Sequence, residues 1–325
     1  MSKNNRKHGI FAVDQRFTDI TLQSINDVRN ALTIEQALRV VFKQMDITGS
    51  RPRTIESYSY VFNDFIKITG LIYVEDIDVD SIYEYLNEIN VAKTTKLLRL
   101  KTIKAVLSRF FDNRWIEHKF WKNIQIKIDK QVKTAANESD IEILLTLIDR
   151  SSFIGFLDSV AILLMYKTGI RIRTLGELRE RHIDLENKAL DLDGAVLKNR
   201  EYLKLPIDDQ LAEMLRTLIQ QNAKIRKKYK KRHDYVFITQ NGLGINRSNS
   251  STNAISKQLT RYSRMYGLKN INAHAIRRAF AKNLLNKGAN VALISKALGH
   301  ADISTTTQYL DLNKEEVANS LREYL

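Results

Sequence analysis

The sequence predicts a mainly α-helical protein with two domains, an all-α domain followed by an α+β domain that contains a small antiparallel sheet. Apolar residues recur at helical spacing through most of the 325 residues, which is the principal sign of amphipathic helices. The chain contains only 2 prolines, and proline disfavours the interior of a helix. The length also favours two domains, because most domains contain about 100–200 residues.

The first domain is expected over residues 33–126 and should contain four helices. The first helix follows Thr33, a residue type that caps helix N-termini, and apolar side chains then recur at intervals of three and four residues. The second helix ends at Gly70, and the fourth, with its apolar positions between residues 100 and 111, carries many basic residues. Residues 1–32 are polar with weak periodicity and are expected to form an N-terminal segment.

A linker and a second domain should follow. Residues 127–137 show little pattern and are predicted to be the linker, and residues 138–325 the second domain with a C-terminal helix. Within it, residues 156–166 are nearly all apolar and predict a buried helix. The helices after residue 252 are expected to break at Gly267, Gly288 and Gly299.

Two segments of the second domain have the pattern of strands. Residues 189–207 alternate apolar and polar side chains, with turn-forming residues near 198–200, and predict a short antiparallel sheet. Residues 235–242, YVFITQNG, predict one more short strand and a turn.

Several classes of protein are excluded by composition. The chain has 0 cysteines, so it has no disulfides, no thiolate metal site and no cysteine nucleophile. We find no apolar run near the roughly 20 residues of a membrane span, and the N-terminus lacks the apolar core of a signal peptide. We therefore expect a cytoplasmic, nucleoid-associated protein with no membrane partner.

The charge is strongly basic and unevenly placed. Lys and Arg number 52 against 37 Asp and Glu, a formal net charge of +15, which favours a nucleic-acid partner. Residues 93–133 hold most of the excess, interleaved with an apolar helical stripe that would leave one face for phosphates. A second basic run at 224–232 fits a solvated surface as well as an anion-binding loop. The predicted DNA-binding residues are Lys93, Lys96, Arg99, Lys101, Lys104, Lys133, Arg173 and Arg278.

Four short motifs occur in order in the second domain. They are Thr168-Gly169-Ile170-Arg171 after the buried helix, Lys198 in the strand turn, His274-Ala275-Ile276-Arg277, and Leu298-Gly299-His300 followed nine residues later by Tyr309. Each motif alone is commonplace, since glycine-capped helices, hairpin lysines and HxxR spacings all arise by chance. Their conjunction in this order is the informative observation.

Together these motifs resemble the tyrosine recombinase, or phage integrase, family, which includes Xer-type resolvases, Cre-type recombinases and integrases of transposons. The resemblance covers residues 138–325 and is strongest over 274–310. It implies the tyrosine recombinase fold for the second domain and a SAM-like four-helix core-DNA-binding domain for the first. It also implies six catalytic residues, namely Arg171, Lys198, His274, Arg277, His300 and Tyr309.

The chemistry that the resemblance implies suits these residue types. Arg171 and Arg277 would grip the scissile phosphate, because guanidinium forks bind phosphate oxygens bidentately. Tyr309 would attack phosphorus after a neutral histidine takes its proton. Lys198 would protonate the leaving 5′ oxygen, and the product would be a 3′-phosphotyrosine. Because the cations supply the positive charge, we expect no metal and no other cofactor.

The chain departs from the family pattern at two positions. Thr174 stands three residues after Arg171, where the family usually has an acidic residue that helps to orient catalytic groups. Its absence would lower activity or be compensated nearby, and Glu177 is a candidate substitute on another part of the helix. Arg278 stands where a second histidine is frequent.

The resemblance implies a site-specific recombinase that exchanges DNA strands through a Holliday junction in a homotetramer, with room for an accessory DNA-bending protein. The two domains would form a C-shaped clamp on double-stranded DNA. The tail 311–325 would form a helix that packs on its own domain or on a neighbouring copy. The short segment before residue 33 favours recombination at core sites alone.

Three alternatives stay open. One is a type IB topoisomerase or telomere-resolving enzyme with the same chemistry. Another is a DNA-binding relative with impaired catalysis, which Thr174 would favour. The third is a basic helical nucleic-acid-binding protein with accidental motifs. The sequence does not distinguish an integrase from a resolvase or a transposon recombinase, and it does not reveal the DNA target.

Overall fold

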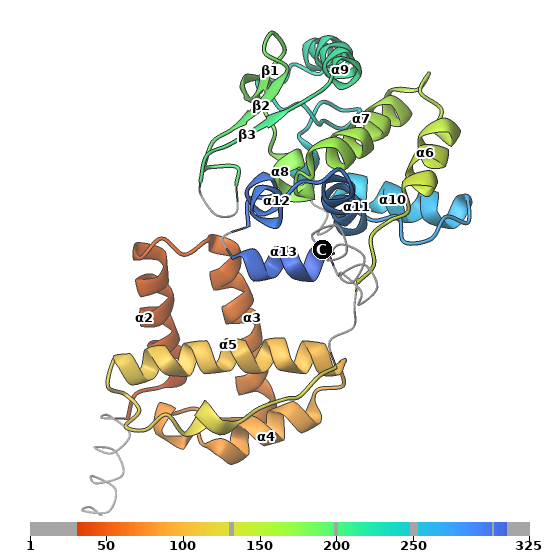
Figure 1. The fold of residues 1–325 in the computed structure, drawn as a ribbon. Helices are drawn as coiled ribbons and strands as arrows, with labels where there is room; N and C mark the ends of the chain where they lie inside the picture. Colours follow the sequence, from red (N-terminus) through yellow and green to blue (C-terminus); the bar gives the residue numbers. More distant parts are fainter. Residues whose placement is uncertain (1–30, 130–132, 198–200, 248–252, 301, 311–325) are drawn as a thin grey trace, which may run out of the picture. The chain divides into compact units, whose positions relative to one another are not determined.

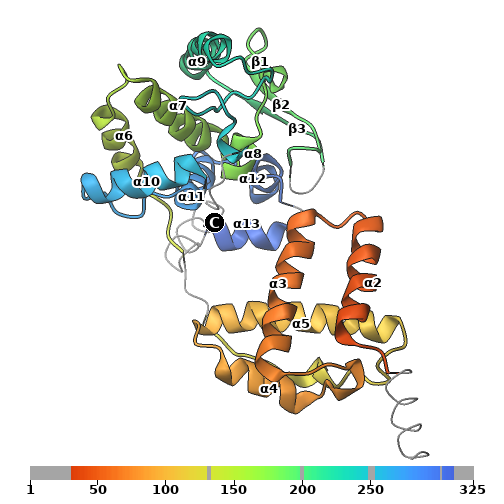
Figure 2. The ribbon, with the colours of Figure 1, turned by 180° about the vertical axis from the view of Figure 1, so that it is seen from behind.

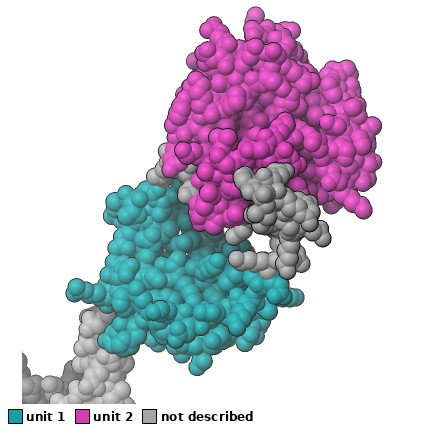
Figure 3. Space-filling model, viewed as in Figure 1, with its two compact units in different colours: residues 1–130 teal, residues 131–325 magenta. Residues whose placement is uncertain are grey.

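The computed structural model describes residues 31–129, 133–197, 201–247, 253–300 and 302–310. The chain divides into two compact units, residues 1–130 and 131–325, coloured separately in Figure 3. This division falls inside the stretch that the sequence predicts as a linker. The described part is mostly helical with one small antiparallel sheet, which confirms the predicted fold class.

The described residues of unit 1 form four α-helices around an aromatic core. They are α2 (Ile34–Ile47), α3 (Pro52–Thr69), α4 (Val79–Glu88) and α5 (Lys93–Asp112), with short 3-10 helices η1 (Val74–Asp76) and η2 (Phe120–Asn123). Thr33 caps α2 by accepting a hydrogen bond from the backbone of Gln36, and Gly70 ends α3 in a left-handed conformation, as the sequence predicts. Phe62 meets Phe65 and Phe110 edge to face at the centre, an arrangement that stabilises aromatic cores.

Unit 2 is built around a buried helix, α7 (Phe153–Thr168). The other helices among its described residues are α6 (Glu138–Leu147), α8 (Ile172–Gly176), η3 (Glu180–His182), α9 (Asp209–Lys228), η4 (Ile245–Arg247), α10 (Ala254–Met265), α11 (Ala273–Asn286), α12 (Val291–Leu298) and α13 (Ile303–Leu310). Helix α7 packs against α9, α10 and α11, and Figures 1 and 2 show α11 beside it from both sides. It is nearly apolar all round, as expected for a helix covered on every face.

The sheet has three antiparallel strands in the order β1-β2-β3. They are β1 (Ile183–Asp184), β2 (Ala189–Leu192) and β3 (Leu203–Pro206), and Leu190 pairs with Leu205. The sheet predicted over 189–207 therefore gains β1, a strand too short to show an alternating pattern. The predicted turn at 198–200 lies outside the described residues.

Of the strand and turn predicted over residues 235–242, the strand is wrong and the turn is confirmed, since the backbone N–H of Gly242 donates to the carbonyl of Thr239 at 2.9 Å. This segment forms only isolated bridges, Tyr235 to Arg179 and Ile238 to Gly244. Its apolar residues are buried because they enter the core of unit 2, but their backbone partners belong to separate loops, so no continuous ladder forms. Burial alone produced the strand-like pattern.

Glycines end the helices that lead into two of the motifs. Gly169 ends α7 at φ 62°, and a Cβ there would also lie 2.3 Å from the ring of Phe280. Gly299 ends α12 at φ 58°. Such left-handed positions favour glycine. Each helix therefore ends at its glycine, and Arg171 and His300 follow shortly after these two ends. The breaks predicted at Gly267 and Gly288 are also confirmed, since both have positive φ just after a helix.

Among the helices of the described residues, none combines the length and the apolar character that a membrane crossing requires.

Candidate active site

The buried Arg277 on α11 forms the centre of the site. Its side chain is turned inward, and the residue is only 3% exposed. One terminal nitrogen donates to the carbonyl of Gly169, at the end of α7, and the other donates to the carbonyl of Leu298, at the end of α12. Carbonyls at helix C-termini lack helical partners and carry partial negative charge. Arg277 therefore satisfies two helix ends and fixes them to α11.

Arg171 approaches the same place from the start of α8. Its Nη2 donates to the carbonyl of Gly299 at 3.0 Å. Because Gly299 directly follows the carbonyl that Arg277 binds, the two guanidiniums meet around one turn. The sequence predicts these two arginines as partners, and the structure brings them together from positions that are 106 residues apart, since 277 − 171 = 106.

His300 follows this turn and is held between Arg277 and α13. Its Nε2 lies 3.2 Å from Nη2 of Arg277, and its Nδ1 lies 2.8 Å from the Thr306 hydroxyl. An arginine can only donate, so Nε2 accepts and Nδ1 carries the proton that it donates to Thr306. These contacts fit a neutral histidine with its proton on Nδ1. Thr306 is a site residue that sequence reasoning missed, because a spacing of six residues from His300 signals no contact.

The electrostatics of the site disfavour the protonated form of both motif histidines. Burial lowers the pKa of His300 to about 4, and the positive charges of Arg277 and Arg171 add to the effect. His274, in the first turn of α11, keeps an exposed surface. The protein atoms around its ring nevertheless lower its pKa by desolvation, and Arg278, Arg277, Lys133 and Arg171 contribute repulsion. Positive potential of this kind attracts phosphate and disfavours a protonated imidazole.

Two predicted catalytic residues have side chains that lie outside the described part of the chain. Tyr309 belongs to α13, one helical turn beyond Thr306, and its side chain lies outside the described residues. Lys198 also lies outside the described residues; Leu197, just before it, is 3% exposed and belongs to the core of unit 2. The structure therefore brings together Arg171, Arg277 and His300, with His274 nearby, and places the helix of Tyr309 against them.

The two departures from the family pattern have defined surroundings. Thr174 is 2% exposed, and its hydroxyl donates to the carbonyl of Val196 at 3.1 Å. Glu177, at the end of α8, accepts a hydrogen bond from Asn246 at 3.2 Å. Arg278 is buried and donates its Nε to the carbonyl of Thr134 at 2.9 Å, so it fastens the segment before α6 to α11.

The predicted DNA-binding residues of α5 differ in their surroundings. Arg99 pairs with Asp64 and donates to the Tyr85 hydroxyl at 2.9 Å. Lys104 donates to two backbone carbonyls, and burial lowers its pKa. Lys96 donates to the carbonyl of Leu86. Lys93 and Lys101 are exposed on the same helix, as are Lys133 and Arg173 in unit 2. The DNA contacts of all eight residues stay untested predictions, and the pairing of Arg99 with Asp64 argues against a phosphate contact at that position.

The second basic run lies at the end of α9. Within it, Arg226 pairs with Glu180 and donates to the carbonyl of Tyr235. The exposed members are Lys224, Lys227, Lys228, Lys230 and Arg232. Cations at a helix C-terminus are favoured by the helix dipole, which is a structural reason for the run.

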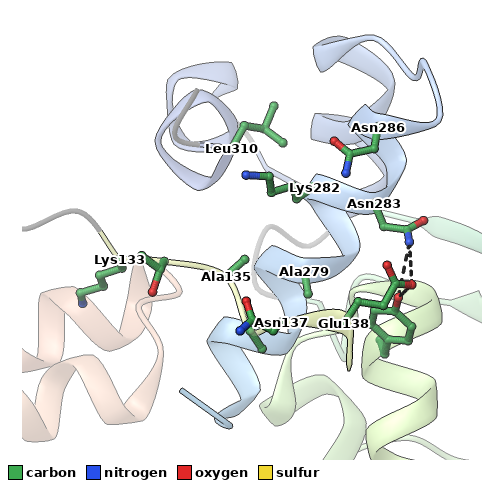
Figure 4. A pocket seen from close by; sticks show the side chains of 12 residues that line it. Lys133, Ala135, Asn137, Glu138, Ala279, Lys282, Asn283, Asn286 and Leu310 are labelled. Carbon is green, nitrogen blue, oxygen red and sulfur yellow. Dashed lines mark hydrogen bonds between the residues drawn. The ribbon is translucent and has the colours of Figure 1, made fainter. Parts of the chain in front are cut away.

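A polar cavity of about 330 Å³ lies beside the end of α13 (Figure 4). Lys133, Lys282 and Leu310 are among its lining residues. On its wall, Glu138 accepts hydrogen bonds from Tyr166 and from Asn283, the latter at 3.1 Å. Burial, followed by the carboxylate of Glu138, raises the pKa of the Tyr166 hydroxyl. These wall residues come from three helices at unrelated spacings, so no sequence pattern could have found them.

Within the described ranges, no group of three or more His, Asp or Glu side chains lies close enough together to hold a metal ion. The expectation that no cofactor is needed stays a prediction.

The mostly helical fold with a small antiparallel sheet agrees with the tyrosine recombinase class. The sequence profile of the phage integrase family matches residues 135–316. The chain thus belongs to the phage integrase family.

Relatives and solved structures agree with this assignment. Tyrosine recombinase XerC of Bacillus pumilus (strain SAFR-032) is 26% identical over 273 residues, which cover 81% of this chain and 87% of the relative. The Tn1549 transposon integrase in complex with a circular intermediate DNA matches with a TM-score of 0.66 at 18% identity, over 89% of this chain and 99% of the other. XerH recombinase bound to palindromic difH substrate matches with a TM-score of 0.65 at 20% identity, over 94% and 88%. The likeness to both structures concerns the fold.

Proposed function

We propose that the protein is a site-specific DNA recombinase that breaks and rejoins strands of duplex DNA through Tyr309. The observation that supports this most directly is the convergence of Arg171, Arg277 and His300 around the turn at Gly299, beside the helix that carries Tyr309. Membership of the phage integrase family makes DNA the expected substrate.

In the proposed reaction the two guanidiniums hold the non-bridging oxygens of the scissile phosphate and stabilise the extra negative charge of the pentavalent state. The Tyr309 oxygen forms a bond to phosphorus as its proton passes to a neutral imidazole of the pair His274 and His300. The bond from phosphorus to the 5′ oxygen breaks, and the Lys198 ammonium supplies the proton to that oxygen. The 3′-phosphotyrosine conserves the phosphodiester energy, so rejoining reverses the same steps.

We further propose that four copies act on two DNA sites and exchange strands through a Holliday junction. The tail 311–325, which lies outside the described residues, would then pack on its own domain or on a neighbouring copy. Exposed cations of both units, including Lys101 and Lys133, would contact phosphates on either side of the cleavage point.

Covalent trapping tests this function. The protein is incubated with nicked duplexes tiled from the DNA that flanks its own gene, and denatured samples are examined for a protein–DNA band. We expect a band with the native chain and with Tyr83→Phe, an exposed tyrosine of unit 1, and none with Tyr309→Phe. Specific retardation of a fragment without any covalent band would instead support a binding-only relative.

A further inference from the structure

Thr174 connects the arginine motif to the end of the chain segment that precedes Lys198. It lies on α8, three residues after Arg171, and is 2% exposed. Its hydroxyl donates to the carbonyl of Val196 at 3.1 Å. The next residue, Leu197, is 3% exposed. The backbone is thus held in position up to the last described residue before Lys198.

Asp193 makes a second set of polar contacts with the same segment. One oxygen of Asp193 accepts from the backbone N–H of Ala195 at 2.9 Å and from that of Val196 at 3.3 Å. Its other oxygen lies 3.4 Å from Nε2 of His182. The backbone N–H of Arg179 donates to Nδ1 of this histidine at 3.1 Å, so Nε2 carries the proton and faces the carboxylate.

The polarity of the Thr174 contact differs from what an acidic residue offers. A carbonyl oxygen requires a donor, and a hydroxyl can donate whereas a carboxylate can only accept. An ionised acid at position 174 would place two buried acceptors against each other, which is costly without a donor between them. The Thr174 hydroxyl therefore supplies the donor that the carbonyl of Val196 requires.

We propose that Thr174 is a positioning residue, whose donated hydrogen bond to Val196 sets the segment that delivers Lys198 to the leaving 5′ oxygen. This inference rests on the proposed recombinase function. It also accounts for the departure from the family pattern. Position 174 carries a hydroxyl donor in place of a carboxylate acceptor, and this donor binds the carbonyl of Val196.

The test uses the full-length chain and single-turnover cleavage of two DNA substrates. One has an ordinary scissile phosphodiester, and the other has sulfur in place of the bridging 5′ oxygen. A thiolate leaves without a proton, so the second substrate does not need Lys198. We expect Thr174→Val, which keeps the shape and removes the donor, to cleave the ordinary substrate about 10–100-fold more slowly and the sulfur substrate at close to the native rate.

Three further variants sharpen the outcome. Thr174→Ser should restore cleavage, and Thr174→Glu, which restores the usual acid, should be as slow as Thr174→Val. Thr146→Val, an exposed threonine on α6, is the matched control and should be unaffected. Thr174→Val combined with Lys198→Ala should be no slower than Lys198→Ala alone, because both changes remove the same step.

Other results would overturn the inference. If Thr174→Val cleaved both substrates at the native rate, the hydrogen bond would have no role, and if it slowed both equally, Thr174 would act on folding or on phosphate binding. A faster Thr174→Glu variant would show that the position needs an acceptor. Failure of the native chain to form any Tyr309-dependent covalent adduct would count against the recombinase function itself, which separates the two failures.

Discussion

The basic helix α5 and the arginine pair of unit 2 show that the partner of a cation decides what its charge can do. On α5, Arg99 pairs with the carboxylate of Asp64, so its charge is largely cancelled inside unit 1. In unit 2, Arg277 donates to two backbone carbonyls and to Nε2 of His300, and Arg171 donates to a third carbonyl; carbonyls are dipoles without net charge. The positive charges of both guanidiniums contribute to the lowered pKa of His300, after burial.

The largest effect should follow from Arg277→Lys. Lysine keeps the positive charge but lacks the fork that reaches two carbonyls and a phosphate together. We expect the single-turnover rate of covalent adduct formation, on the DNA site found by covalent trapping, to fall by about 100–1,000-fold. Arg216→Lys, which changes an exposed arginine of α9, should retain the native rate. An active Arg277→Lys enzyme would show that charge alone, without the fork, suffices at this position.

Arg99 should behave differently because its charge is already paired. We expect Arg99→Leu to lower the free energy of unfolding of unit 1 by about 2 kcal/mol, since Asp64 would be left half-buried without its cation. The slope of DNA affinity against salt should stay the same. Denaturant unfolding and binding titrations at several salt concentrations measure the two quantities. A smaller salt slope together with unchanged stability would reverse the assignment and place Arg99 among the phosphate contacts.

The same contrast explains how far the sequence could predict this molecule. Helices with clear periodicity, the glycine breaks and the motif order were all predictable, because each depends on residues close together in the chain. The strand predicted within residues 235–242 was wrong, because its apolar residues are buried in the core of unit 2 without forming a continuous ladder. The charge count could not separate Arg99 from Lys101, since the carboxylate that neutralises Arg99 comes from another helix. The contacts of Thr306 and Thr174 likewise depend on tertiary packing.

His300 should make the stability of unit 2 depend on pH. Its pKa is about 4 in the folded chain against 6.5 in the unfolded chain. Between these values the unfolded state binds more protons, so the free energy of unfolding falls as the pH falls from 6.5 to 4. Because the histidine keeps some exposure, we expect a contribution of about 1–2 kcal/mol.

Comparison with His300→Gln isolates this contribution, because glutamine can accept from Arg277 but does not titrate. The native chain should lose more stability than the variant over this range, as measured by denaturant unfolding at pH steps between 4 and 7. Asp158 has a pKa raised to about 6 by burial, an effect of opposite sign, but it is present in both proteins and cancels. Parallel curves would contradict the low pKa of His300.

The smallest effect is expected for Lys101, the exposed counterpart of Arg99 on α5. If this lysine contacts one phosphate, Lys101→Ala should reduce the slope of log affinity against log salt by about 0.9 and weaken binding a few-fold near physiological salt. Stability should not change, because the side chain is exposed. Lys43→Ala, an exposed lysine of α2, provides the matched control for net charge. If both variants reduced the slope equally, the effect would come from the overall charge of unit 1, and the face of α5 would have no special part in DNA binding.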